Sequence, residues 1–597
     1  MTAATAAAAV KDANHIAHRL SRLRSTPATS SLLAATNFTE FGTAAAALPL
    51  SQLDAGELVT VVSACSRARF NGQDVWRPAA RLLSPRLADV DGRSIAAVAS
   101  AFTAVRIRDE PLLAAIAARS SALIAGGEDM QVHSVVTLLE SLRCFHFQDD
   151  GQGVFALMEE WLARHAGRLS IHDIARALGS LAQLSHSAPV LLPAARPRIV
   201  ELAAGLSCST GETTCSTRHI TMLLSAYARL SARDEVALEA LAGAMSRPVP
   251  AEYLASLVKT LAVQLKPAPP SLKKVVEASL PACASSLEVY DLAIIVPALP
   301  LIPGLRASYN GLGQAVFGAC LAAPLSRFRP RSLVGVIRSA LALGHSDVDF
   351  WVLALRQAER SIVNDLREGT LFWSADDLAG VCLLAARVLT SGSKDGARNP
   401  RLHSALLQAG NPDSAAQATA PAAKKLLSAA LDAARARYTE LTPRALGLLS
   451  VALVKAKVDD GGLFALISHR AGQILSRNPD AFGSRDVAQL LAGFARFRYR
   501  DETLLQDLAA IAEAGMASYD KVAREIVLWS LSEFGGVPGK HPALQEALLE
   551  YELAHGRKSG RAQPHLESME VSPADPADAD FVVSLPEEPA RRSSPAP

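Results

Sequence analysis

The sequence predicts an all-α protein, an α-solenoid of about twelve stacked helical-hairpin repeats of roughly 38–40 residues each. Three observations lead to this prediction. The composition favours closely packed helices, one sixteen-residue pattern recurs along the chain, and apolar residues follow helical spacing at regularly repeated positions.

The composition points to helices rather than sheets. Half of the 597 residues are hydrophobic, but only 5% are aromatic, and Ala and Leu dominate. A β-sandwich would need more aromatic and β-branched residues on its faces. The net charge of +2 is unevenly placed, because residues 564–590 carry seven acidic side chains and no Lys or Arg. The remaining chain is mildly basic, which permits an anionic partner.

The recurring pattern is clearest in three stretches. "LLAGFARFRYRDETLL" (Leu490 to Leu505), "LLSAYARLSARDEVAL" (Leu223 to Leu238) and "VASAFTAVRIRDEPLL" (Val98 to Leu113) share an Arg-Asp-Glu triplet and a final Leu in one frame. Within the triplets Asp109, Asp234 and Asp501 precede a second apolar run, where an Asp would cap a new helix. Each unit is therefore expected to be a pair of helices.

Extending this frame gives twelve units, each defined by an anchor, the first apolar residue of its leading helix. Ten of the eleven anchor-to-anchor intervals lie between 34 and 46 residues, and the exception is 68. Three residues after each anchor the side chain is apolar, and six residues after it eleven of twelve are Ala, Ser, Thr or Gly, which would let neighbouring helices approach closely. The anchors are Leu58, Ile95, Val135, Ile174, Ile220, Leu254, Leu292, Leu333, Leu378, Leu446, Val487 and Ile526.

These patterns divide the chain into five segments. Residues 50–390 and 426–556 are expected to form the solenoid, separated by an inserted flexible loop at 391–425, which is rich in Gly, Pro, Ser and Ala. Residues 557–597 have the composition of a disordered acidic, Pro-rich tail. Residues 1–49 contain one acid before Glu40 together with Lys11, Arg19, Arg22 and Arg24, which is typical of an organellar transit peptide. A simple Ala-rich leader is the alternative.

The repeat resembles the helical repeats of organellar RNA-binding proteins. The form "hhxAhARLxxRDExLL" is similar to the octotricopeptide and heptatricopeptide families and to the helical-repeat domain of the RNA-editing substrate-binding complex. The resemblance implies a mitochondrial protein, or alternatively a plastid or cytoplasmic one. It implies single-stranded RNA and the protein subunits of a ribonucleoprotein as partners, and a role in RNA processing, editing, stability or ribosome assembly. The compact RAP-type domain that ends many such proteins has no counterpart here.

Cations recur in and beside the turn that joins the two helices of a unit. If the units stack in register, these side chains would form a ladder that follows a phosphate backbone, although the neighbouring acids could neutralise it. Phe494 and Phe497, by contrast, fall on the apolar stripe and are expected in the core. The candidate RNA-binding residues are Arg106, Arg108, Arg229, Arg233, Arg387, Lys455, Arg496, Arg498, Tyr499 and Arg500.

Other function classes find no support in the sequence. No phosphate-binding loop, zinc-protease or nucleophile-elbow motif occurs, so no enzyme, cofactor or small-molecule substrate is predicted. The seven cysteines are dispersed, and His133, His172 and His219 fit exposed first-turn positions better than metal ligands. No apolar run is long enough to span a membrane. The competing hypothesis is a HEAT- or armadillo-like protein scaffold without RNA contact, which alternating charge pairs would favour over a continuous basic stripe.

Overall fold

The computed structural model describes residues 50–555, apart from 68–69, 71, 128–129, 149–152, 207–212, 246–247, 264–268, 303–304, 306–308, 392–411, 538 and 540. Throughout the described residues the regular secondary structure is helical, and no strand occurs among them. The predicted N-terminal extension 1–49 and the predicted tail 557–597 lie outside the described residues.

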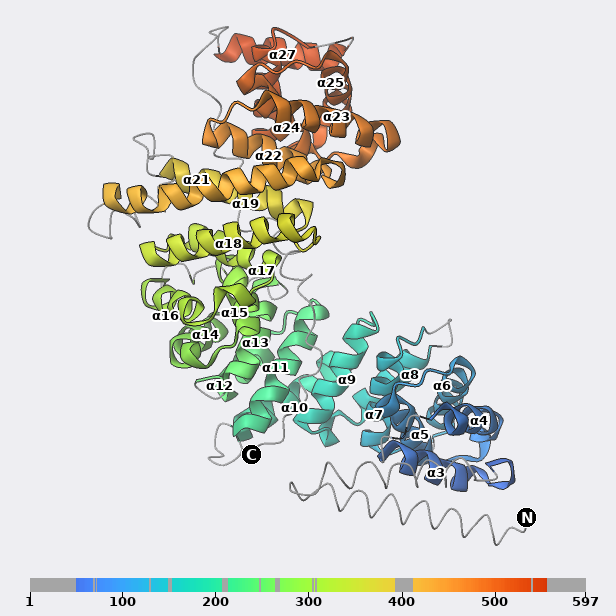
Figure 1. Cartoon of the computed structure of the whole chain (residues 1–597). Helices are drawn as coiled ribbons and strands as arrows, with labels where there is room; N and C mark the ends of the chain where they lie inside the picture. Colours follow the sequence, from blue (N-terminus) through green and yellow to red (C-terminus); the bar gives the residue numbers. More distant parts are fainter. Residues whose placement is uncertain are drawn as a thin grey trace. The chain divides into compact units, whose positions relative to one another are not determined.

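Twelve helical hairpins follow one another along the described chain (Figure 1). We call the first helix of each hairpin its A helix and the second its B helix. The A helices are α3 (Ala55–Arg67), α5 (Gly92–Val105), α7 (Val132–Cys144), α9 (Ile171–Gln183), α11 (Thr213–Arg229), α13 (Ala251–Val263), α15 (Val289–Ala298), α17 (Pro330–Leu343), α19 (Ala375–Ser391), α22 (Pro443–Ala456), α24 (Ser484–Phe497) and α26 (Lys521–Glu533). The B helices are α4 (Gln73–Leu83), α6 (Glu110–Ala125), α8 (Val154–Arg164), α10 (Leu191–Leu206), α12 (Glu235–Ala244), α14 (Pro270–Cys283), α16 (Tyr309–Ala322), α18 (Val348–Glu368), α21 (Pro412–Ala436), α23 (Gly461–Arg477), α25 (Glu502–Gly515) and α27 (Pro542–His555).

The predicted repeat frame is confirmed. Each of the twelve anchors lies in an A helix and is at most 1% exposed, including Leu254 and Leu292 in the proline-rich region. The chain divides into two compact units, Met1–Val249 with Pro269–Val275 and Pro250–Ala268 with Val276–Pro597. Each unit is a stretch of α-solenoid in which consecutive hairpins stack.

Consecutive A helices pack closely because small residues line their contact. In the first unit α3, α5, α7, α9 and α11 stack in that order, and in the second α13, α15, α17, α19, α22, α24 and α26 do so. The contact between α22 and α24 shows the constraint most clearly. A Cβ added at Gly493, six residues after its anchor, would lie 2.7 Å from the Cβ of Ser450. The small residue at this frame position therefore sets the distance between helices.

The A helices end in one recurrent turn. In eight hairpins the amide twelve residues after the anchor donates to the carbonyl seven residues after it, at 2.9–3.1 Å, the 6→1 bond of a Schellman cap. The donors are Phe70, Ile107, Phe147, His186, Ala232, His345, Val458 and Tyr499. In seven of these turns, the residue before the donor has positive φ; these residues are Arg106, His146, Ser185, Ser231, Gly344, Lys457 and Arg498.

Aspartates begin several B helices, as predicted. The side chains of Asp109, Asp234 and Asp501 accept from the backbone amides of Leu112, Ala237 and Leu504. Asp347 and Asp460 occupy the same frame position and cap α18 and α23. A carboxylate here satisfies amides that have no partner within the helix.

A second recurrent bond ties together the two helices of five hairpins in the described chain. An arginine of the B helix, or of the segment just after it, donates to the carbonyl five residues before the anchor of the same hairpin. The pairs are Arg86 with Leu53, Arg119 with Val90, Arg198 with Leu169, Arg437 with Trp373, and Arg470 with Leu441. These arginines hold the chain where it enters the A helix.

The structure corrects the inserted loop predicted at 391–425. Residues 412–425 are helical, because α21 begins at Pro412 and runs for 25 residues to Ala436. The segment is rich in Ala, the strongest helix former, and α21 buries Leu426 and Leu427 while packing against α18 and α19. The rest of the predicted loop, 392–411, lies outside the described residues.

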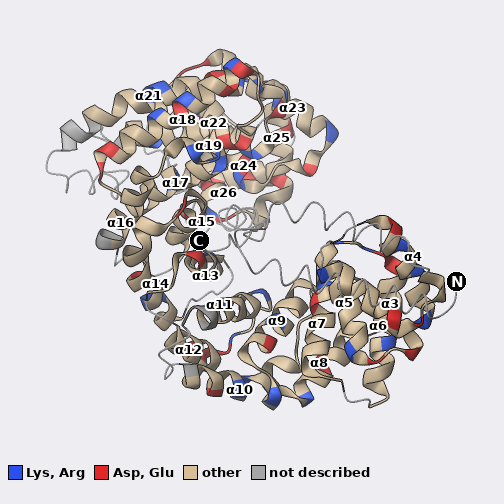
Figure 2. Cartoon of the chain, turned by 60° about the horizontal axis from the view of Figure 1, so that its bottom comes forward, with Lys and Arg blue, Asp and Glu red and all other residues tan. Residues whose placement is uncertain are grey.

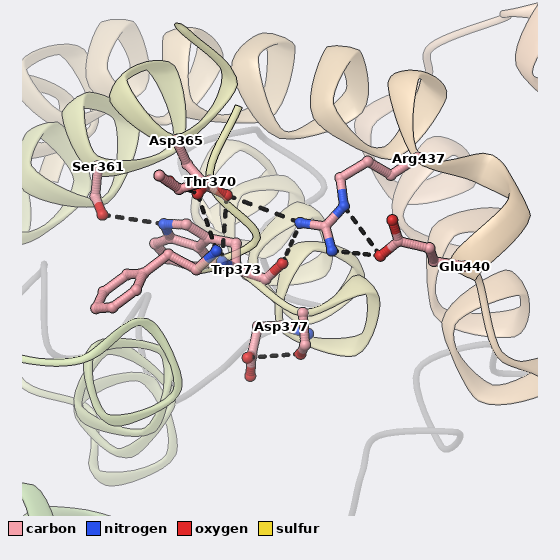
Figure 3. Close-up of polar contacts among 9 residues, drawn as sticks. Ser361, Asp365, Thr370, Trp373, Asp377, Arg437 and Glu440 are labelled. Atoms are coloured by element: carbon pink, nitrogen blue, oxygen red, sulfur yellow. Dashed lines mark hydrogen bonds and ion pairs between the residues drawn. The ribbon is translucent and has the colours of Figure 1, made fainter. Parts of the chain in front are cut away.

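A buried polar cluster fixes α21 to the two helices before it (Figure 3). Asp365, 8% exposed at the end of α18, accepts the amides of Phe372 and Trp373 at 2.9 and 3.2 Å and also the Thr370 hydroxyl. Arg437, directly after α21, lies 3.8 Å from the Asp365 carboxylate and pairs with Glu440. The cluster therefore joins α18, the start of α19 and the end of α21.

The close contact of α22 with α24 predicts a steric cost. We expect Gly493→Ala to lower the free energy of unfolding by about 1–3 kcal/mol through overpacking, although Ala gains about 1 kcal/mol in helix propensity. Gly472→Ala in α23 is the matched control, because no atom lies within 4 Å of an added Cβ there. It should leave stability unchanged or raise it. Urea denaturation measures both, and equal effects would contradict the close contact.

Burial of His345 predicts a pH dependence of stability. The ring stacks on Phe317 at 4.4 Å, and burial lowers its pKa to about 4. The unfolded chain therefore binds the proton more readily, so this contribution is complete above about pH 6.5 and falls by about 1.4 kcal/mol per pH unit toward pH 4. We expect the free energy of unfolding to fall less between pH 7 and pH 5 in His345→Phe than in the unaltered chain, as measured by urea denaturation at both pH values. An unchanged pH dependence would contradict it.

Candidate nucleic-acid interface

The predicted turn arginines fall at defined places in the hairpin. Arg106 and Arg498 are the left-handed residues that end α5 and α24, with φ of 58° and 53°. Arg108, Arg233 and Arg500 lie in the short segment between the A and B helices. All five side chains are exposed. A cation at the C-terminal end of a helix is also favoured by the helix dipole, so part of this recurrence is architectural.

Two of these arginines have partners within the chain. Arg108 forms an ion pair with Glu110 at 2.5 Å, with both side chains more than half exposed. Such a pair contributes little stability and can exchange partners. Arg500 donates to the Phe534 carbonyl oxygen at 2.8 Å, which links the end of one hairpin to the next.

The aspartates beside the arginines are occupied elsewhere. Asp234 accepts from Arg196 of α10 at 2.6 Å, and Asp501 accepts from the Ser468 hydroxyl of α23 at 2.5 Å, in addition to their capping bonds. These acids therefore join successive B helices. In the part of the chain that the structure describes, the side chains of Arg106, Arg233, Arg496 and Arg498 form neither a hydrogen bond nor an ion pair.

Tyr499 is held by aromatic neighbours. Its ring stacks on Phe464 at 5.9 Å and lies 5.4 Å from Phe494, and it is half-buried. Phe494 is fully buried, as expected of a core side chain, whereas Phe497 is half-buried and contacts Phe464 at 5.3 Å. The aromatic residues Phe494, Phe497 and Tyr499 therefore contribute to the packing of α23 against α24.

The remaining candidates lie toward the C-terminal ends of A helices, nine residues after the anchor. Arg229 and Arg496 are exposed, while Arg387 and Lys455 are half-buried. A second set of cations, which the sequence analysis missed, lies in the first helical turn two residues before the anchor. In the second unit this set is Arg331, Arg444, Arg485 and Arg524.

Where both positions carry a cation, the two cations lie on one side of the A helix. Their positions are eleven residues apart, just over three helical turns, so Arg444 and Lys455 lie on the same side of α22, and Arg485 and Arg496 on the same side of α24. We call the side of α17, α19, α22, α24 and α26 that bears these end positions the A-helix cation side. Between the two ends most of its residues are buried, as Leu448 and Val451 are in α22. This side carries eight cations, Arg331, Arg338, Arg387, Arg444, Lys455, Arg485, Arg496 and Arg524, and four acids, Asp376, Asp377, Asp486 and Glu525.

The acids on this side lie among the cations. Burial raises the pKa of Asp377 and of Asp486, while Arg331 beside Asp377 and both Arg444 and Arg485 beside Asp486 act in the opposite direction. Figure 2 shows Lys and Arg interspersed with Asp and Glu along the helices. The surface is therefore neither a continuous basic stripe nor a strict alternation, but a mixed surface with excess positive charge.

In the first unit, histidines stand at the start of the A helices. His133 and His172 are exposed, as predicted, whereas His219 is half-buried and its ring lies 4.7 Å from that of His172. Burial lowers the pKa of both His172 and His219, and the neighbouring Arg176 and Arg218 act in the same direction. No cluster of three or more His, Cys, Asp or Glu suited to a metal ion occurs among the described residues.

Most of the cysteines that the structure describes are not placed for nucleophilic chemistry, although Cys144 is exposed. Cys65, Cys283, Cys320 and Cys382 are buried, and burial raises the pKa of the Cys65 and Cys320 thiols to about 12. A thiol with so high a pKa is a poor nucleophile at neutral pH.

Within the described part of the chain, no helix is long and apolar enough to cross a membrane.

Comparison with known proteins gives only distant likenesses. No protein-family model and no curated protein matches the chain. Among solved structures, it is similar to the full-length AP-3 complex in an intermediate open conformation, a homology model (TM-score 0.35, 12% identity, 91% of this chain and 99% of that chain). It is also similar to the pentatricopeptide repeat protein PPR10 bound to an 18-nucleotide psaJ RNA element (0.24, 13%, 97% and 98%) and to PPR10 from maize (0.24, 12%, 96% and 94%). TM-scores of this size carry no inference about function.

Proposed function

We propose that this chain is a non-catalytic RNA-binding helical-repeat protein that holds single-stranded RNA along the A-helix cation side of its second unit. The observation that carries the proposal is the pairing of two cation positions on the same side of the consecutive helices α22 and α24, with a cation at one of these positions in α17, α19 and α26. Packed helices lie about 8–10 Å apart, so cations recur at an interval that a flexible strand can follow. Arg498, whose side chain has no partner among the described residues, extends this side into the turn after α24.

The binding proposed here is mainly electrostatic. Phosphate contacts made by Lys and Arg release counterions, so affinity falls steeply with salt and depends little on sequence. Base stacking contributes less, because Tyr499 packs on Phe464 and, among the large hydrophobic side chains exposed in the described residues, Phe372 is the one aromatic. The surface therefore fits the strand's backbone rather than its bases.

The proposed setting is an organelle, most simply the mitochondrion, where the chain would act within a ribonucleoprotein in RNA processing, editing, stability or ribosome assembly. The support is the acid-poor, Arg-containing composition of residues 1–49 and the form of the repeat. A fluorescent protein fused to residues 1–49 should enter mitochondria, and the same fusion with Arg19, Arg22 and Arg24 changed to Glu should not. Cytoplasmic or plastid fluorescence from the unaltered fusion would contradict a mitochondrial address.

The competing function is a protein scaffold. The acids among the cations favour it, since Asp486 lies beside both Arg444 and Arg485 and reduces their attraction for phosphate. A scaffold of this kind would bind no RNA even at low salt.

Removing cations from the proposed surface should weaken RNA binding without unfolding the chain. The variant combines Arg444→Gln and Arg496→Gln with Arg498→Gly, because Gly relieves the left-handed backbone at 498. Each lost phosphate contact makes the slope of log affinity against log salt shallower by about 0.7. We expect a slope shallower by about 2 and an affinity roughly 10–100-fold lower near 50 mM salt for a 20-nucleotide polyuridine, measured by fluorescence anisotropy.

The matched control removes the same number of charges from a B helix. Arg356→Gln, Arg360→Gln and Arg367→Gln change three exposed arginines of α18 and give the same net charge. This control should bind RNA almost as the unaltered chain does. Equal losses in both variants would show a non-specific charge effect, and absence of binding by the unaltered chain at low salt would leave the scaffold as the function.

A further inference from the structure

We propose that the acidic segment 564–590 of this same chain occupies the A-helix cation side and competes there with RNA. This inference rests on the proposed function, since it concerns the regulation of that surface. Because the segment belongs to the same chain, every molecule carries this competitor close to the surface.

Charge complementarity is the first argument. Segment 564–590 carries seven carboxylates, at Glu567, Glu570, Asp575, Asp578, Asp580, Glu587 and Glu588, and no Lys or Arg. The A-helix cation side carries eight cations against four acids. Of these cations Arg331, Arg444, Arg496 and Arg524 are exposed, so an acidic segment can reach them without displacing any part of the core. A row of carboxylates offers these cations the same sign of charge as a row of phosphates.

The place where the segment leaves the fold is the second argument. The last described helix, α27, ends at His555, a few residues before the segment, and packs against α26 in the same unit. α26 bears Arg524 at the end of the A-helix cation side. The segment therefore enters from one end of the row of cations, next to its last helix.

The length of the segment is sufficient to follow the whole row. An extended chain spans about 3.3 Å per residue, so the 27 residues of 564–590 can reach roughly 90 Å. Five A helices packed about 8–10 Å apart occupy roughly 40 Å. Because the segment is tethered, its effective concentration at the surface is on the order of millimolar, which makes even weak contacts competitive with RNA.

The main experiment compares full-length chains in RNA binding. In one variant the seven acids of the segment become amides (E567Q, E570Q, D575N, D578N, D580N, E587Q and E588Q). A control variant of equal net charge neutralises seven exposed acids of B helices instead, Asp74, Glu160, Glu239, Glu368, Asp507, Glu546 and Glu550. The probe is a labelled 20-nucleotide polyuridine, titrated at 50 mM and 300 mM salt. We expect the first variant to bind at least about tenfold more tightly than the unaltered chain at 50 mM and the difference to shrink at 300 mM, while the control changes little.

A second measurement detects the contact without RNA. A labelled peptide of residues 564–590 is added to the full-length chain whose own segment has been neutralised. The peptide should bind in a salt-sensitive way, a peptide with the seven acids as amides should not bind, and adding Arg444→Gln, Arg496→Gln and Arg498→Gly to the chain should weaken binding of the acidic peptide.

The outcomes separate this inference from the proposed function. If RNA binds equally tightly to all three chains and the peptide does not bind, the inference is overturned while RNA binding stands. If the peptide binds at the cation side but no chain binds RNA, the proposed function fails and the contact of the segment stands. If the B-helix control binds RNA as tightly as the segment variant, the effect is one of net charge, and the inference is overturned.

Discussion

The structure depends on one hydrogen bond, the 6→1 bond that closes the end of the A helices. It recurs at the same frame positions in eight hairpins, from Phe70 with Cys65 to Tyr499 with Phe494. Because it fixes the direction in which the chain leaves the A helix, it also fixes where the Asp cap of the B helix lies. Equivalent side chains then recur at equivalent places, and consecutive A helices can pack through small residues such as Gly493.

The same bond accounts for how charge is presented at the surface. It requires one residue in the left-handed conformation, and at Arg106, Lys457 and Arg498 that residue carries a cation. The helix dipole favours a cation there, and the side chain points away from the packed helices and into solvent in the case of Arg106 and Arg498. Cations at these positions are therefore favoured both by the helix end and by the proposed RNA binding. For this reason their recurrence in the sequence did not distinguish a structural role from a binding role.

Sequence reasoning succeeded for features that neighbouring residues determine, such as helix positions and helix caps. Periodicity located all twelve anchors, and the Asp caps followed from the residue type and its place before an apolar run. Sequence reasoning failed for contacts between residues that lie far apart in the chain. The bond of Arg196 to Asp234 joins residues 38 positions apart, and the bond of Arg437 to Trp373 crosses the insertion, so neither follows from spacing. The helix at 412–425 was missed because Pro and Gly nearby suggested a loop. The cations two residues before the anchors of α17, α22, α24 and α26 were missed because polar residues in a first turn are common.

We propose above that single-stranded RNA lies along the A-helix cation side. Photo-crosslinking of a 4-thiouridine-substituted 20-nucleotide RNA to the full-length chain, followed by mass spectrometry, tests it directly. If RNA lies there, crosslinks are concentrated in peptides from the first and last turns of α22, α24 and α26, around Arg444, Arg485, Arg496 and Arg524. Crosslinks concentrated on B helices such as α18 and α25, with none on these turns, would contradict it.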